Sequence, residues 1–281
     1  MEILIIYYGI LTAVLGAIFG SFLNCMAMRI SRGEDFIQGR SHCMDCGHEL
    51  KAGDLIPVIS FMASRGRCRY CGKKISPRYP AAELLFMILS LLLYITRIGA
   101  AGESGLDIPV IIGFIRDWAL TGCLFALSIT DLETYEIPDG YIISGILIWI
   151  AGTVAESVIY PLSCSQPLRL TDIGHHLAAG VICGGVMLAM SLIMDRLLKK
   201  ESLGGGDIKL FFMLGLYMTY FGVYGLIFLS AVIGLLMMPV IKRIKNGDER
   251  VPFGPAIAMA EYILLIVGGP LEGLYINAVF G

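Results

Sequence analysis

The chain has 281 residues, of which 57% are hydrophobic and only 16% are charged, and its formal net charge is −2. Soluble globular domains are usually roughly 45–50% apolar and about a quarter charged, so this composition excludes an ordinary soluble domain. The absence of a basic excess also argues against a nucleic-acid partner. We therefore expect a polytopic membrane protein whose main surroundings are a lipid bilayer.

Eight apolar segments fit the pattern of membrane helices, for which roughly 20 residues make one crossing. They cover residues 3–25, 80–97, 108–130, 139–160, 174–195, 207–220, 222–241 and 255–276. The first has neither a basic start nor a small-residue cleavage motif, so we expect a retained helix and not a signal peptide. The predicted fold class is an all-α polytopic membrane protein with about eight transmembrane helices.

The distribution of Lys and Arg predicts the orientation of these helices. If the N-terminus lies outside, four segments face the cytoplasm: residues 26–80, 131–138, 196–209 and 242–254. They hold all of the 21 Lys and Arg except Arg97, Arg116 and Arg169. Because cytoplasmic loops concentrate positive charge, we expect a multi-pass protein of the cell membrane with both termini outside.

Residues 29–80 differ from the rest of the chain, because charge, Gly and Pro rise there and the apolar runs stop. We therefore predict three parts: a first transmembrane helix at 1–28, a small cytoplasmic domain at 29–80 and a membrane core at 81–281. Within the cytoplasmic domain, CMDCG from Cys43 and CRYCG from Cys68 repeat one pattern, Cys-x-x-Cys-Gly.

Paired Cys-x-x-Cys turns are typical of a structural zinc site. Two residues between the thiolates let both sulfur atoms of a turn reach one ion, and the Gly that follows lets backbone N–H groups point at sulfur. We predict that Zn²⁺ is held by four ligands, Cys43, Cys46, Cys68 and Cys71. Four thiolates leave no open coordination position, and a domain of about 50 residues has little core, so the metal would be structural.

Other interpretations of these cysteines are disulfides, free thiols or redox-active pairs. The reducing cytoplasm disfavours disulfides, and two copies with matching glycines suit a shared ion better than a redox motif. His42 and His48 lie beside the first turn and are alternative ligands, although beside four cysteines they fit surface positions better.

Acidic residues gather at two expected cytoplasmic helix ends. The stretch SITDLETYEIPDG, residues 128–140, carries no basic residue and four acids: Asp131, Glu133, Glu136 and Asp139. Asp207 follows a run of three glycines at the start of an apolar segment. Gly costs about 1 kcal/mol relative to Ala inside a helix, and a carboxylate in hydrocarbon costs several. An arrangement this unfavourable indicates a functional role.

Two close carboxyl groups can share one proton, because like charges cannot both ionise cheaply. One then activates water and the other protonates the substrate, which is the chemistry of aspartyl proteolysis. Asp131 sits on the end of a helix, where position is rigid, and is the favoured partner of Asp207. A glycine run of Gly204, Gly205 and Gly206 would let the backbone loosen and approach a substrate strand.

The same acids also fit structural roles. Asp139 fits the first turn of the next helix, and Glu133 and Glu136 fit solvated loop charges. Asp207 fits an N-cap after a glycine turn, and the residues alone leave this role and the catalytic pair equally open. An ion-binding transporter with a helix broken at Gly204–Gly206 is a further alternative, but it leaves the cysteine turns unexplained.

Five ordered blocks resemble the type IV prepilin peptidase family across nearly the whole chain. They are GSFLNCMAMRI from Gly20, the two Cys-x-x-Cys turns, ISPRYPAAELL from Ile75, DLETYEIPD from Asp131 and LGGGDIKL from Leu203. The Gly-x-Gly-Asp signature in the last block is shared by intramembrane aspartyl proteases that include presenilin and signal peptide peptidase.

The resemblance implies that Asp131 and Asp207 are the catalytic pair. It implies as substrate a prepilin or pseudopilin whose short leader is cut after a glycine on the cytoplasmic side. It also implies an association with pilus or type II secretion assembly machinery.

Many members of the family also methylate the new N-terminal amine with S-adenosylmethionine, an activity linked to the zinc-bearing loop. Since this chain keeps all four cysteines of that loop, we expect both reactions. A peptidase without methyltransferase activity is the alternative, because no glycine-rich nucleotide fingerprint is present. Glu83, just inside the second helix, is a candidate contributor or simply a favourable first-turn acid.

Two smaller features concern packing. The glycine-rich stretch Gly180–Gly185 is typical of a close contact between membrane helices. The adjacent charges Arg116 and Asp117 fit a neutralised pair at the outer membrane boundary.

Overall fold

The structure is a computed structural model that describes residues 2–35, 39–101, 107–159, 170–199, 203–244 and 251–280. Two isolated β-bridges are the only extended pairing among these residues, which are otherwise helices, turns and loops. Arg169, one of the three positive charges expected outside, lies beyond the described residues. The chain divides into two compact units, Met1–Glu103 and Ser104–Gly281, and each is treated by itself.

Each of the eight apolar segments forms a helix. The first unit contains α1 (Glu2–Ser31) and α3 (Arg78–Tyr94), which continues into a π-helical turn, η2 (Ile95–Gly99). The second unit contains α4 (Ile108–Thr134), α5 (Asp139–Ile159), α6 (Leu170–Leu198), α7 (Gly205–Gly215), α8 (Tyr220–Ile244) and α9 (Gly254–Phe280). The all-α class expected from the composition is therefore confirmed.

Within the described residues, six helices are long and apolar enough to cross a membrane: α1, α3 with η2, α4, α5, α6 and α8. α9 contributes a shorter apolar stretch, Gly254–Gly268. α7 has only 11 residues and rises about 16 Å, whereas the hydrocarbon core of a bilayer is about 30 Å thick. The apolar run at 207–220 therefore forms a helix of about half the length of a crossing.

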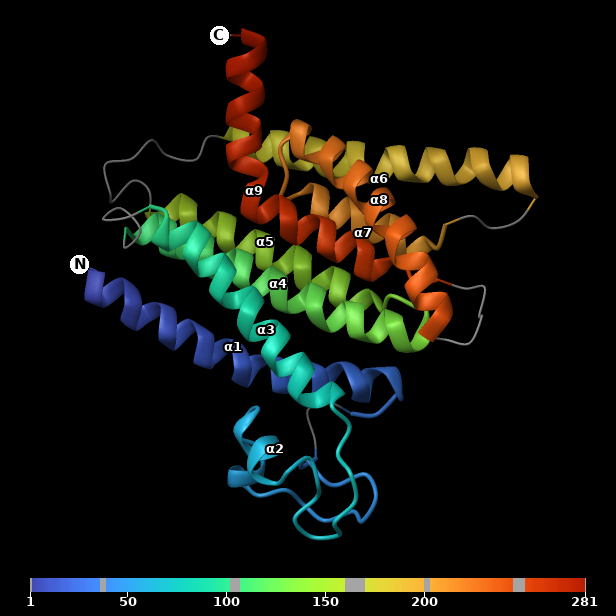
Figure 1. Ribbon diagram of the computed structural model, residues 1–281. Helices are drawn as coiled ribbons and strands as arrows, with labels where there is room; N and C mark the ends of the chain where they lie inside the picture. Colours follow the sequence, from blue (N-terminus) through green and yellow to red (C-terminus); the bar gives the residue numbers. More distant parts are fainter. Residues whose placement is uncertain are drawn as a thin grey trace. The chain divides into compact units, whose positions relative to one another are not determined.

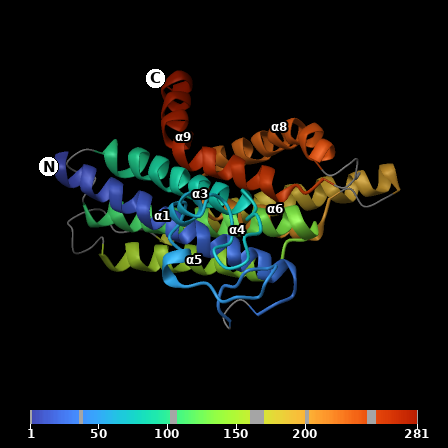
Figure 2. The same cartoon turned by 60° about the horizontal axis from the view of Figure 1, so that its bottom comes forward.

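The first unit is built on a close antiparallel pair, α1 and α3, which lie side by side in both views (Figures 1 and 2). A Cβ atom on Gly20 would lie 3.1 Å from the Glu83 Cα atom, and one on Gly16 would lie 3.0 Å from the α3 backbone. At the other end, the Tyr94 hydroxyl donates to the Ile5 carbonyl at 2.8 Å. Glycines four residues apart share one helix face, so the two backbones can approach closely.

The segment between α1 and α3 contains the two cysteine turns and two short helices, η1 (Ala52–Asp54) and α2 (Ile59–Ala63). Neither short helix buries any residue fully. A segment with so little apolar burial needs another source of stability, such as a bound metal.

The second unit is centred on α4. Half of the residues in the most apolar part of this helix are buried. α4 packs against α5 and α9, α8 packs along α9, and α6 packs on α7 (Figure 1). The largest fully buried apolar side chains of this unit are Leu120, Leu127, Leu210, Phe211, Met213, Leu214, Leu216, Leu226 and Ile257. The core therefore forms where α4, α7, α8 and α9 meet.

Arg116 and Asp117 form the expected pair, and a third residue completes the group. The Arg116 Nε atom donates to Asp117 Oδ1 at 3.1 Å, and a guanidinium NH group donates to Glu156 Oε1 at 3.1 Å. The Asp117 side chain is 1% exposed. The triad therefore links α4 to α5, and removing one member would leave the other charges buried without compensation.

The glycines of α6 let α7 approach closely, as the glycine-rich stretch predicted. A Cβ atom on Gly180 would lie 3.1 Å from the Phe212 carbonyl oxygen, and one on Gly184 would lie 2.8 Å from the Phe212 Cβ atom. From the opposite side, a Cβ atom on Gly215 would lie 2.8 Å from the Gly180 Cα atom. The two backbones are thus in direct contact.

The variant Gly215→Ala is expected to destabilise the second unit by roughly 1–3 kcal/mol, because its methyl group meets backbone that cannot turn away. The matched control is Gly185→Ala on α6, where an added Cβ meets nothing within 4 Å and Ala is the better helix former. Thermal unfolding of the purified proteins in detergent would compare them. Equal midpoints for the two variants would contradict the close contact.

Candidate active site and metal centre

The two Cys-x-x-Cys-Gly turns have the same backbone geometry. In the first, the Gly47 N–H donates to the Cys43 carbonyl at 2.9 Å, and in the second, the Gly72 N–H donates to the Cys68 carbonyl at 2.9 Å. Both glycines have positive φ, 68° and 72°, a conformation that glycine adopts without strain. The repeated sequence pattern therefore produces a repeated turn.

The sulfur atoms of the two turns converge on one point. Those of Cys43, Cys46, Cys68 and Cys71 all lie within 4.8 Å of one another. The Cys43 and Cys71 sulfur atoms are 3.9 Å apart. A tetrahedral ion with metal–sulfur bonds of about 2.3 Å separates its sulfur ligands by about 3.8 Å, so the cluster could hold a metal ion.

The two neighbouring histidines are outside this cluster. His42 bridges to Glu49 across the first turn, and its Nδ1 atom lies 3.3 Å from the Arg40 carbonyl oxygen. The His48 ring stacks on Tyr70 with ring centroids 3.6 Å apart. The cluster found among the described residues contains cysteines alone.

The pKa of the thiol group differs between Cys43 and Cys71. The backbone N–H groups of Cys46 and Asp45 lower the pKa of the Cys43 thiol to about 7. At Cys71 the backbone N–H of Lys73 also favours the thiolate, but desolvation and the neighbouring sulfur atoms outweigh it and raise the pKa to about 12. Four sulfur atoms this close therefore cannot all ionise unless a cation shares the site.

Asp131 lies in the last turn of α4, where the helix ends at Thr134. Tyr135 ends the helix in a left-handed conformation with φ 60°, and its N–H donates to the Asp131 carbonyl at 2.9 Å. The Asp131 residue is 3% exposed, and its Oδ2 atom accepts from the Gly254 N–H at 2.8 Å. Since Gly254 opens α9, the carboxylate lies at a helix N-terminus, where a negative charge is stabilised.

Asp207 is part-buried in the first turn of α7. Gly204 is the N-cap of that helix, with no side-chain cap, and the Asp207 N–H donates to the Gly204 carbonyl at 3.1 Å. Asp207 is therefore not the N-cap, which was one of its two possible roles. Its carboxyl group is close enough to that of Asp131 for the two to interact electrostatically.

The three glycines before Asp207 have different surroundings. A Cβ atom on Gly204 would lie 3.3 Å from the Asp207 Oδ2 atom, and one on Gly206 would lie 3.0 Å from the Ile137 Cβ atom. At Gly205 a Cβ atom would meet nothing within 4 Å. The α4–α5 loop thus packs on Gly206, while Gly205 borders open space.

The remaining acids of residues 128–140 lie at the surface. Glu133 and Glu136 are exposed. Asp139 opens α5, as its expected first-turn role requires, and its Oδ1 atom accepts from the Lys209 ammonium at 2.7 Å. This pair is more than half exposed on both sides, so its contribution to stability is small.

Sequence reasoning missed Gly254. It occurs in VPFGP, just before the last apolar segment, where a Gly-Pro pair signals only a helix start. A Cβ atom there would lie 2.6 Å from Asp131 Oδ2 and 3.1 Å from Leu127 Cδ2. No pattern within the chain links this glycine to an acid 123 residues earlier.

Two family models match the chain. The bacterial peptidase A24 N-terminal domain matches residues 14–97, and the type IV leader peptidase family matches residues 118–238. The first match contains the four cysteines and the second contains Asp131 and Asp207. The two models therefore cover the metal cluster and the acid pair in turn.

Relatives in several bacteria are similar over nearly all of the chain. The prepilin leader peptidase/N-methyltransferase of Myxococcus xanthus is 32% identical over 89% of this chain and 70% of its own length. The enzyme of that name in Bacillus subtilis is 29% identical over 95% of this chain and 98% of its own. The type 4 prepilin-like proteins leader peptide-processing enzyme of Escherichia coli is 29% identical over 96% and 95%. No solved structure matches the chain.

One metal ion per chain is expected to co-purify with the protein, because four sulfur atoms already lie at ligand spacing. The variant Cys46→Ser is expected to lose most of this metal, since a hydroxyl is a poor ligand for a soft metal site. The control is Cys25→Ser, a free cysteine of α1 outside the cluster. Elemental mass spectrometry measures the content, and equal metal in both variants would contradict the site.

Proposed function

Because the chain belongs to the type IV leader peptidase family, we propose that it cuts the short leader from type IV prepilins or pseudopilins with Asp131 and Asp207 as catalytic acids. The observation that carries this proposal is the packing of the loop after α4 on Gly206, next to Asp207, which brings the two carboxyl groups close enough to interact electrostatically. Asp131 lies on α4 and Asp207 lies on α7, so the two acids are far apart in the sequence. An N-cap role for Asp207 would not require this meeting.

The proposed reaction needs no covalent intermediate. One carboxylate removes a proton from water while the water oxygen forms a bond to the scissile carbonyl carbon. The other carboxyl group donates its proton to the carbonyl oxygen. When the carbon–nitrogen bond breaks, the leaving amine takes a proton from the pair, and one hydroxyl group of the tetrahedral intermediate returns its proton to the pair as the new carboxyl group forms. One proton is shared by the two acids before and after the reaction, so the pair is regenerated.

The two acids have different supports, which suits this chemistry. The Gly254 N–H holds Asp131 in a buried position, so its carboxylate is pre-positioned. Asp207 follows the glycine run, and Gly205 borders open space. An extended substrate backbone can approach a chain that carries no side chain at that point. We therefore assign the glycine run, Gly204, Gly205 and Gly206, to substrate binding.

The protein is a multi-pass protein of the inner membrane, and we propose that its cysteine domain and acid pair face the cytoplasm. The concentration of Lys and Arg in residues 26–80, 196–209 and 242–254 supports this orientation. Both termini would then lie outside. A prepilin would present its leader to the acids from the cytoplasm while its apolar stem remains in the bilayer, and the pilus or type II secretion machinery would receive the product.

We propose that the metal of the cysteine cluster is Zn²⁺ and that the chain also methylates the new N-terminal amine with S-adenosylmethionine. Four sulfur ligands in tetrahedral spacing are the donor set of structural zinc sites. The relatives in Myxococcus xanthus and Bacillus subtilis are named as N-methyltransferases. In this chain, two turns of the same geometry bring four cysteines together. A closed four-sulfur shell leaves the metal no open position for substrate.

The variants Asp131→Asn and Asp207→Asn are each expected to lower leader cleavage roughly a thousandfold or more, because an amide can neither share nor transfer the proton. Cleavage of a purified prepilin in detergent, followed by mass spectrometry, measures the rate. Glu133→Gln, an exposed acid on the same helix, is the control and should retain the normal rate. A normal rate in either Asn variant, with an unchanged thermal midpoint, would refute the catalytic pair.

Gly254→Ala is expected to lower leader cleavage at least about tenfold, because a small misplacement of a catalytic group is costly. The added Cβ would lie 2.6 Å from Asp131 Oδ2, so the carboxylate has to move. Gly268→Ala on the same helix is the control, since its Cβ makes an ordinary 3.9 Å contact with Leu264. If both variants cleave at the wild-type rate, Asp131 does not depend on Gly254 for its position.

A further inference from the structure

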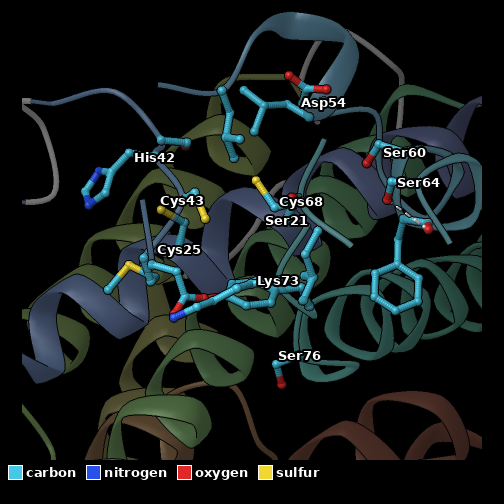
Figure 3. Close-up of a pocket in the computed structure, with 18 of the residues that line it drawn as sticks. Ser21, Cys25, His42, Cys43, Asp54, Ser60, Ser64, Cys68, Lys73 and Ser76 are labelled. Atoms are coloured by element: carbon cyan, nitrogen blue, oxygen red, sulfur yellow. Dashed lines mark hydrogen bonds and ion pairs between the residues drawn. The ribbon is translucent and has the colours of Figure 1, made fainter. Parts of the chain in front are cut away.

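A cavity of about 400 Å³ lies within the first unit, beside the cysteine cluster (Figure 3). Small-molecule sites in proteins are commonly about 300–1,000 Å³. Three parts of the unit line it: α1 through Ser21 and Cys25, the cysteine turns through Cys43 and Cys68, and the start of α3 through Glu83. The cavity thus joins the metal cluster to the helix pair.

Glu83 is a buried carboxylate on this cavity. The residue is 9% exposed; its Oε1 atom accepts from the Ser21 hydroxyl at 2.6 Å and its Oε2 atom accepts from the Val58 N–H at 2.7 Å. These donors suit an ionised carboxylate. Among the described residues no basic side chain pairs with it. Since buried charges are normally paired, the position calls for a cation from outside the chain.

The second donor to Glu83 comes from strained backbone. Val58 has φ 60° and ψ −48°, a conformation that a β-branched residue avoids. This conformation directs the Val58 N–H at Glu83 Oε2. Strain of this kind persists only where the surroundings enforce it, and it concentrates at ligand sites.

The rest of the cavity offers groups for a larger polar ligand. Phe61 and Tyr70 line it with aromatic rings, and Arg67 is one of six basic residues on its wall. The Asp54 carboxylate accepts from the Tyr70 hydroxyl at 3.0 Å and pairs with Arg69 at 3.2 Å. Aromatic rings stack on nucleobases, carboxylates accept hydrogen bonds from ribose hydroxyls, and Arg binds carboxylates.

We infer that this cavity binds the methyl donor S-adenosylmethionine, with Glu83 placed against the positively charged sulfur of the ligand. This inference rests on the methyltransferase half of the proposed function. The ligand combines a cation, a purine riboside and a carboxylate, which are the groups that this cavity can bind. Transfer of its methyl group to a neutral amine breaks the sulfur–methyl bond, forms a nitrogen–methyl bond and releases one proton from nitrogen.

The position of the cavity also links the metal cluster to methyl transfer. Cys43 and Cys68 belong to the cluster and line the cavity. A metal held by them stabilises the cavity wall without an open position for the reacting groups. The cluster would thus act on methyl transfer through the shape of the donor site.

The inference is tested by calorimetric binding of two ligands to the purified full chain in detergent. S-adenosylhomocysteine lacks the methyl group and the positive charge on sulfur, so wild-type protein should bind S-adenosylmethionine about tenfold more tightly or better. Glu83→Gln keeps the shape of the side chain but removes its charge, so this preference should disappear. Glu49 is an exposed glutamate of the same domain that does not itself line the cavity, and Glu49→Gln should keep the preference.

A second variant tests the location. Ser60 lines the cavity (Figure 3), and Ser60→Trp should abolish binding of both ligands, while its metal content reports that the cysteine turns have formed. Binding that survives both Glu83→Gln and Ser60→Trp would overturn the site. Equal binding of the two ligands by wild-type protein would overturn the role of Glu83.

The test of donor binding is independent of the test of the catalytic pair. Asp207→Asn is expected to lose cleavage and keep donor binding, so a failure of the catalytic pair leaves this inference standing. Wild-type protein that cleaves a leader but binds neither ligand would overturn the inference together with the methyltransferase half of the proposed function.

Discussion

A buried hydrogen bond, from the Gly254 N–H to the Asp131 carboxylate, ties the end of α4 to the start of α9. It satisfies an N–H group that every helix leaves without a partner in its first turn, and it places a negative charge where the helix dipole favours it. The bond requires a residue without a Cβ atom at position 254. Gly254 therefore links α9 to α4 at this point and sets the position of the Asp131 carboxylate.

The short helix α7 carries the second acid, Asp207. Its glycine contact with α6 holds it by backbone proximity, and its first turn carries Asp207. A helix of 11 residues begins and ends inside the unit, so its N-terminal turn can lie among other helices rather than at the end of a full crossing. A backbone run without side chains thus lies close to a firmly held acid, a combination that suits the proposed role of admitting a chain and then acting on it.

Local features of the fold could be predicted from the sequence, because their causes are local. An apolar run forms a helix in lipid whatever its neighbours are, and the spacing of Cys43 and Cys46 brings two sulfur atoms together within one turn. The length of α7 could not be predicted, since the apolar run continues past Gly215 and only successive tight turns from Leu216 to Met218 end the helix. Contacts between distant segments, such as that of Gly254 with Asp131, leave no pattern in a single sequence. The contacts of Glu83 with Ser21 and Val58 are of the same kind.

The division of the chain at residue 103 has an evolutionary consequence. The cavity with Glu83 is made entirely by residues before this point, and both aspartates come after it. Genetic drift that erodes one set of residues leaves the other set untouched. If methyl transfer uses the first set, as inferred above, a lineage that no longer benefits from a modified amine can lose the cavity by gradual decay, and a duplicated gene can give each copy a single task.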